Sequence, residues 1–140
     1  MGALTGKAEA FKLRRSSERG RLMERIRFIS HEGNRILLVD CVDCNAQELA
    51  AISDQVPKVL QNEPEASTLL LADFTGTQVT REGVERLKIA AALDRKHLKR
   101  SAWVFNGNFP KPLFDSVKAF TQRDIRIFQK REEALEYLVA

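Results

Sequence analysis

Hydrophobic positions along the chain follow two patterns, short apolar runs and longer segments with helical spacing. The short runs, typical of strands, predict strands over residues 25–30, 35–41, 67–73, 100–106 and 124–129. The segments with apolar residues three and four apart, typical of amphipathic helices, predict helices over residues 45–60, 80–98, 113–120 and 131–139. Asn45, with Glu48 three residues later, and Thr80 are the expected helix caps. Pro57 lies inside the first helix and is expected to kink or split it.

The order of these elements, β-β-α-β-α-β-α-β-α, defines the fold class. Gly33-Asn34 is expected to supply the positive φ of a tight turn, so the first two strands form a hairpin. Later strands alternate with helices, and such crossovers produce parallel strands with helices on the faces of the sheet. We therefore predict a single α/β domain over residues 25–140, with a mostly parallel five-stranded sheet and one antiparallel edge strand. Leu37, Leu70 and Val104 lie in continuous apolar runs and are expected to be fully buried.

The net charge of +4 is unevenly distributed over the 140 residues. Residues 1–27 hold eight basic and three acidic side chains, whereas the rest of the chain is nearly balanced. We interpret residues 1–24 as a flexible basic extension and expect residues 1–20 to be dispensable for folding. Phe11 is the one aromatic residue of the extension, so a nucleic-acid partner is not favoured. With no run of about 20 apolar residues and no secretory signal, a cytoplasmic protein without a membrane span is expected.

The motif Cys41-Val42-Asp43-Cys44 lies where a predicted strand passes into a helix. Redox-active thiol pairs occupy such positions, because the helix N-terminus lowers the pKa of the nearer thiol. The alternative is a pair of small, partly buried residues at a strand end. A zinc site would need two further ligands, and His31 and His97 are far apart in the sequence. No metal or cofactor is therefore expected.

Polar residues gather at the ends of the predicted parallel strands, where α/β proteins bind ligands. Asp40, Asp43 and Asp73 end or follow these strands, and the loops after them carry no histidine or lysine as an acid–base partner. No nucleotide-binding motif accompanies them. Binding of a partner or ligand is therefore favoured over catalysis. The candidate binding residues are Asp73, Thr75, Gly76, Thr80, Arg81, Asn106 and Asn108.

A basic cluster marks the end of the second predicted helix. Cations at that position complement the helix dipole, which is a sufficient structural reason for them. An anion site is the alternative. The cluster consists of Arg95, Lys96, His97, Lys99 and Arg100.

Three phrases of the sequence, residues 29–40, 70–76 and 132–138, resemble SpoIIAA-like, STAS-related bacterial proteins. The similarity extends over about residues 25–140. It implies a β/α fold whose strands lie largely in chain order. Well-known members are anti-sigma-factor antagonists, which bind partner kinases and are switched by serine phosphorylation. A related fold occurs in the lipid-carrying SEC14-type domains.

The sequence departs from the antagonists where their phosphorylated serine opens the second helix. The matching stretch is Thr80-Arg81-Glu82-Gly83, with Arg81 at the acceptor position. The resemblance therefore implies a non-enzymatic regulatory module that binds a protein partner without the phosphoacceptor serine. Its surface would include the solvent-facing segment from Asp73 to Arg81. The alternatives are a small-ligand or lipid carrier, and a thiol–disulfide enzyme that uses Cys41 and Cys44.

Overall fold

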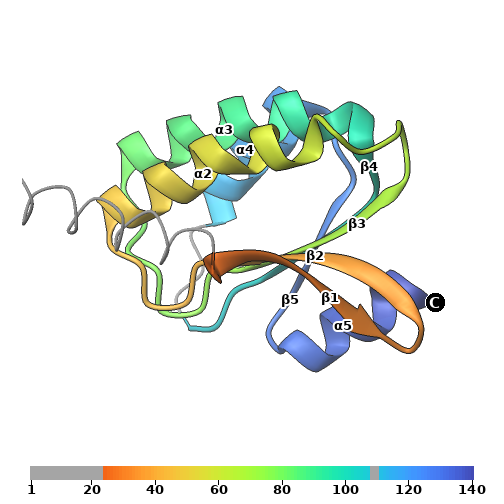
Figure 1. Ribbon diagram of the computed structural model, residues 1–140. Helices are drawn as coiled ribbons and strands as arrows, with labels where there is room; N and C mark the ends of the chain where they lie inside the picture. Colours follow the sequence, from red (N-terminus) through yellow and green to blue (C-terminus); the bar gives the residue numbers. More distant parts are fainter. Residues whose placement is uncertain (1–23, 108–110) are drawn as a thin grey trace, which may run out of the picture.

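The computed structural model describes residues 24–107 and 111–140, and within them the chain forms a mixed five-stranded sheet with helices on both faces (Figure 1). The strand order β1-β2-β3-β4-β5 follows the chain. The predicted α/β class, element order and single antiparallel strand pair are confirmed. Residues 1–23 of the predicted extension, and Asn108, lie outside the described residues. The elements are β1 (Ile26–His31), β2 (Asn34–Asp40), α2 (Ala46–Leu60), β3 (Thr68–Asp73), α3 (Arg81–Asp94), the 3₁₀ turn η1 (Arg95–His97), β4 (Leu98–Val104), α4 (Lys111–Thr121), β5 (Ile125–Phe128) and α5 (Arg131–Val139).

The hairpin of β1 and β2 closes through a two-residue turn. His31 pairs with Asn34 across the antiparallel ladder, and the residues between them have positive φ, 50° at Glu32 and 78° at Gly33. The predicted positive φ is confirmed at Gly33, whereas Asn34 is already paired in β2 and Glu32 takes the other positive φ. Two consecutive positive φ angles are typical of the type I′ turn, whose twist matches that of the paired strands.

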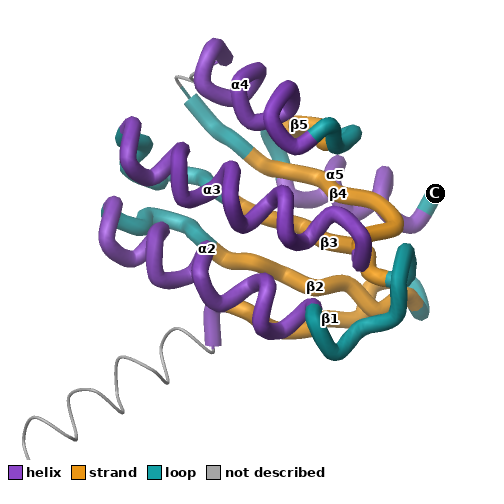
Figure 2. Tube along the Cα trace, turned by 90° about the horizontal axis from the view of Figure 1, so that it is seen from above, coloured by secondary structure: helices purple, strands orange, loops and turns teal. Residues whose placement is uncertain are grey.

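The strands β2 to β5 are parallel, and the helices that connect them all lie on one face of the sheet. Figure 2 shows α2, α3 and α4 side by side above the strands, with α5 on the opposite face. Side chains alternate between the two layers, as the period of a strand requires. Leu37 and Leu70 belong to the core beneath α2 and α3, and Val104 belongs to the core shared with α5. All three are buried, as predicted.

The helix boundaries confirm the predicted caps and correct two expectations. Asn45 accepts from the Glu48 amide at 2.8 Å, and the Glu48 carboxylate accepts from the Asn45 amide at 3.2 Å, so the capping box is complete. Pro57 does not split α2. It lies in the last turn, where its carbonyl still accepts from the Gln61 amide, and buried apolar residues on both sides hold the helix against the sheet.

The second predicted helix is shorter than expected. α3 ends at Asp94, a 3₁₀ turn follows, and Leu98 already pairs with Thr68 as the first residue of β4. The helical spacing of apolar residues therefore continued into a segment whose backbone belongs to the sheet.

Candidate functional site

The carboxylates at the ends of β2 and β3 are held by an arginine from the start of α5. Asp40 and Asp73 are register partners, and the Arg131 guanidinium lies 2.9 Å from Asp73 Oδ2 and 3.8 Å from Asp40 Oδ1. Asp73 Oδ1 accepts from the Thr75 amide at 3.0 Å and from the Thr75 hydroxyl at 2.6 Å. Both carboxylate oxygens of Asp73 therefore have partners within the domain.

The prediction that the whole segment from Asp73 to Arg81 faces solvent is wrong at its first two residues. Asp73 is 5% exposed and Phe74 is 3% exposed. Asp73 is the last residue of a strand buried along its full length, and its bonds to Arg131 and Thr75 replace those it would make with water. Asp73 therefore organises the loop after β3 from within.

The loop between β3 and α3 is bonded along its length to the cysteine motif. The Thr75 carbonyl accepts from the Asp43 amide at 2.8 Å, and the Cys44 carbonyl accepts from the Gln78 amide at 2.9 Å. The Thr77 hydroxyl donates to the Cys41 carbonyl. Two of the predicted sites, the cysteine pair and the β3–α3 loop, thus form one structural unit.

A glycine is required where this loop passes closest to the cysteine motif. Gly76 has a φ of 70°, and a Cβ at this position would clash with the carboxylate of Asp43. Asn106 is exposed in the segment after β4, and within the described residues no hydrogen bond joins it to the loop. Asn106 is therefore not shown to share a site with Thr75 and Gly76.

Both cysteines are buried, and they lie at opposite ends of a tight turn. The Cys44 amide donates to the Cys41 carbonyl at 3.2 Å, and Asp43 between them has a φ of 56°. A side-chain hydrogen bond between Cys41 and Cys44 is the main cause of the raised pKa of Cys41, and burial of Cys41 is the second cause. The same bond, assisted by the positive charge of Arg25, lowers the pKa of Cys44.

Arg25, the residue before β1, lies over this turn. Its Nη1 is 3.2 Å from Cys44 Sγ, and it also lies 3.2 Å from the Asp40 carbonyl oxygen and 3.1 Å from that of Val42. Arg25 is a site residue that no sequence pattern indicates. It is one of eight basic residues within residues 1–27, and nothing in its spacing distinguishes it.

The start of α3 has the predicted cap. Thr80 Oγ1 accepts from the Gly83 amide at 3.1 Å, so its hydroxyl is engaged with the helix backbone. Arg81, in the first turn, is exposed to solvent. The helix therefore presents an exposed cation beside a capped N-terminus.

The outer surface of the helical layer carries large apolar side chains. Ile89 and Leu93, one turn apart on α3, are 59% and 60% exposed, and Phe120 of the neighbouring helix α4 is 59% exposed. We call these three residues the outer apolar face. Ile89 and Leu93 fall outside the inner-face series of Val84, Leu87 and Ala91, and that mismatch in the sequence could have revealed them.

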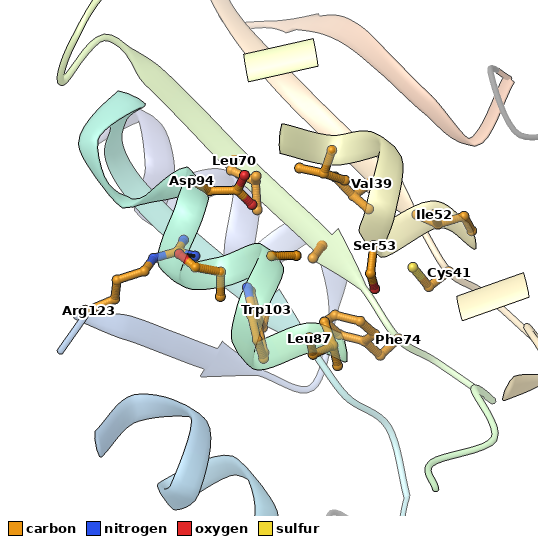
Figure 3. A pocket seen from close by; sticks show the side chains of 14 residues that line it. Val39, Cys41, Ile52, Ser53, Leu70, Phe74, Leu87, Asp94, Trp103 and Arg123 are labelled. Atoms are coloured by element: carbon orange, nitrogen blue, oxygen red, sulfur yellow. Dashed lines mark hydrogen bonds between the residues drawn. The ribbon is translucent and has the colours of Figure 1, made fainter. Parts of the chain in front are cut away.

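A small cavity lies between the sheet and helices α2 and α3, with a buried carboxyl group in its wall (Figure 3). Its volume is about 40 Å³. Among the described residues, buried Asp94 Oδ1 has no hydrogen-bond partner, and burial raises the pKa of Asp94 to about 7, although the nearby Arg123 opposes this shift. Arg123 itself donates to the Ala91 carbonyl at 3.1 Å and to the Ser101 hydroxyl. Asp94 continues the inner-face spacing of α3, and a charged residue at such a position is a signal in the sequence that could have identified it.

The described residues contain no group of His, Cys, Asp and Glu that could hold a metal ion. His97 is buried, with its Nδ1 2.9 Å from the Glu63 carbonyl oxygen, and His31 lies at the hairpin. In the basic cluster, Arg100 is engaged with the Tyr137 and Ala140 carbonyls at 3.1 and 2.8 Å. No helix among the described residues is both long and apolar enough to cross a membrane.

No protein-family model matches this chain, and no curated protein or solved structure matches it either.

Proposed function

We propose that this protein is a non-enzymatic, cytoplasmic interaction module whose protein partner docks on the outer apolar face. The observation that carries the proposal is the exposure of Ile89 and Leu93 together on the central helix of the layer, with Phe120 on the next helix. Single exposed apolar residues are common, but neighbouring large ones on one face are typical of interaction surfaces.

The chemistry of the partner is suggested by the charges around this face. Arg81 is exposed in the first turn of α3, where it meets the positive end of the helix dipole. Arg86, in contrast, is engaged with Asp54 of α2 at 2.8 Å. A fitting partner would place an apolar helix or strip over Ile89 and Leu93 and an acidic side chain opposite Arg81.

The strand-end carboxylates offer less support for catalysis. Asp73 is buried and bonded through both oxygens, so it has no free lone pair directed at a substrate. The resemblance to STAS-related proteins agrees with an interaction role, because its well-known members act by binding other proteins. Arg81 at the phosphoacceptor position makes a serine switch an unsuitable mechanism for this chain.

The lipid-carrier alternative is disfavoured by the size of the cavity beneath α2 and α3. A water molecule needs about 10–15 Å³ of such volume, so 40 Å³ holds a few waters rather than an acyl chain. We therefore place the interaction surface outside the helical layer rather than within it.

The test is a comparison of matched variants in partner capture from the source cells, followed by binding measurements with purified components. Leu93→Glu should abolish binding of the captured partner, because it introduces a charge into the apolar face. Gln129→Glu, exposed in the loop before α5, is the matched control and should bind like the wild type. A partner that binds Leu93→Glu with unchanged affinity would contradict the proposed surface.

A further inference from the structure

The cysteine motif has a geometry that the interaction function does not use. The 3.2 Å bond from the Cys44 amide to the Cys41 carbonyl closes a four-residue turn. Such a turn brings its first and last Cα atoms within about 7 Å, and disulfides usually require Cα separations of about 4.4–6.8 Å. The two cysteine side chains also influence each other, because their interaction raises the pKa of Cys41 and lowers that of Cys44. The backbone therefore needs little rearrangement to link the two sulfurs.

The two sulfurs have different surroundings, and the difference favours Cys44 as the nucleophile. Cys44 receives a hydrogen bond from the Cys41 thiol and another from Arg25, and it immediately precedes the N-cap of α2. A donor, a cation and a helix N-terminus each stabilise a thiolate. Cys41 lies deeper, with Asp40 as its sequence neighbour, and its surroundings favour the protonated form.

Arg25 lies on the solvent side of Cys44 and contacts its sulfur. Both cysteines are 1% exposed, so a reagent cannot reach either sulfur in the closed arrangement. The Arg25 side chain that covers Cys44 is itself 30% exposed, and it is held by carbonyl oxygens and by Glu48 at 3.9 Å. Rotation of this partly exposed arginine would remove one contact from the Cys44 sulfur, and the sheet hydrogen bonds do not depend on it.

We propose that Cys41 and Cys44 form a reversible intramolecular disulfide in which Cys44 is the attacking thiol, Cys41 the resolving thiol and Arg25 a positioning residue. The proposal is independent of the outer apolar face, which lies on other residues.

With a small-molecule disulfide such as oxidised glutathione as the oxidant, the chemistry balances. The Cys44 thiolate attacks one glutathione sulfur, the glutathione S–S bond breaks, and the leaving thiolate takes up the proton that Cys44 released. Cys41 then attacks Cys44 Sγ in the mixed disulfide, and the second glutathione leaves with the proton of Cys41. The protein loses two hydrogens, and one glutathione disulfide becomes two thiols.

In the experiment, the full chain is incubated with oxidised glutathione, samples are quenched rapidly with acid, and the intact mass of the protein is measured. The wild type should lose the mass of two hydrogens, and reduced glutathione should reverse the change. Cys41→Ser should stop at one covalently bound glutathione on Cys44, because it lacks the resolving thiol. Cys44→Ser should react at least about tenfold more slowly, because only the buried, protonated Cys41 remains.

Two arginine variants test the role of Arg25. Arg25→Gln removes the cation from Cys44 and also removes a side chain that contacts its sulfur. Two readouts are therefore needed, one for the pKa and one for accessibility. The pH at which Cys44 of the Cys41→Ser background becomes reactive should rise, whereas accessibility to a neutral alkylating reagent at high pH should not fall. Arg27→Gln is the control, because Arg27 Nη1 lies 2.6 Å from the Glu24 carbonyl oxygen and, within the described residues, no hydrogen bond joins Arg27 to either cysteine.

Each outcome decides the proposal. A wild-type chain that keeps its mass in oxidised glutathione, while the same chain in urea forms the disulfide, would overturn it. Faster capture of glutathione by Cys41 than by Cys44 would overturn the assignment of the attacking thiol. Circular dichroism of both serine variants identifies misfolding, and the wild-type result decides the disulfide itself without any variant.

Discussion

Two buried aspartates of this protein lie near arginines, and their surroundings differ in almost every respect. Asp73, at the carboxyl end of β3, has both oxygens bonded, to Arg131 on one side and to Thr75 on the other. Asp94, at the end of α3, is equally buried, yet its Oδ1 has no partner. Arg123 lies close enough to act on Asp94 by charge, but its hydrogen bonds go to the Ala91 carbonyl and the Ser101 hydroxyl.

The difference shows that burial of a carboxyl group does not by itself indicate its role. A fully bonded carboxylate such as Asp73 stabilises the surrounding loops, because its hydrogen bonds and ion pair compensate for the loss of hydration. A carboxyl group with a buried oxygen that lacks a hydrogen bond, such as Asp94, opposes folding when it is charged, and its raised pKa reflects that cost. The first is a structural centre, and the second is a weak point of the fold.

The largest effect on stability is expected from Leu70→Ala, because Leu70 and Asp94 both line the cavity between the sheet and helices α2 and α3. Removing a buried leucine side chain should lower the free energy of unfolding by about 2–5 kcal/mol. The enlarged cavity should also admit water, which would hydrate Asp94 and lower its pKa. Denaturant unfolding at several pH values would measure both changes. The expected loss of stability together with an unchanged pH profile would show that Asp94 is not influenced by this cavity.

The next effect concerns the pH dependence that Asp94 imposes. Burial raises the pKa of Asp94 from 3.8 to about 7, so between these values the folded state retains a proton that the unfolded state has released. The free energy of unfolding should therefore fall as pH rises from about 4 to 7, by about 2–3 kcal/mol between pH 5 and pH 8. Asp94→Asn should flatten this slope and stabilise the protein at pH 8. If the free energy of unfolding of Asp94→Asn still falls with pH to the same extent, another titratable group causes the pH dependence.

The opposite sign is expected for Asp73→Asn. The amide keeps the size of the side chain but cannot neutralise Arg131, so the free energy of unfolding should fall. We expect a loss of about 2 kcal/mol, below the 3–5 kcal/mol of fully buried pairs, because the Arg131 side chain is 34% exposed. Thermal unfolding of Asp73→Asn beside Asp40→Asn, whose oxygen lies 3.8 Å from Arg131, would measure the difference. Equal losses in both variants would contradict the central position of Asp73.

The sequence predicted the fold more completely than the site, and the physical reason is the range of the interactions involved. Period and capping are local, so the strands around Leu37 and Leu70 and the Asn45 cap could be predicted. The bond between Asp73 and Arg131 joins residues 58 positions apart, and no local pattern encodes it. Arg25 over Cys44 is likewise a tertiary contact.

The smallest effect is expected where a charge is neither buried nor paired. Arg81 is exposed, and within the described part of the chain no ion pair or side-chain hydrogen bond holds it. Arg81→Glu places a carboxylate in the first turn of α3, where the helix dipole favours an anion by about 0.3–1 kcal/mol, while the neighbouring Glu82 opposes it. The melting temperature should therefore change little, in contrast to Asp73→Asn and Asp94→Asn. Affinity for a partner that docks beside α3 should nevertheless decrease, because the reversed charge repels an acidic contact. A marked loss of stability in Arg81→Glu would show that this end of α3 is held by its charge and would extend the comparison of buried carboxylates to an exposed arginine.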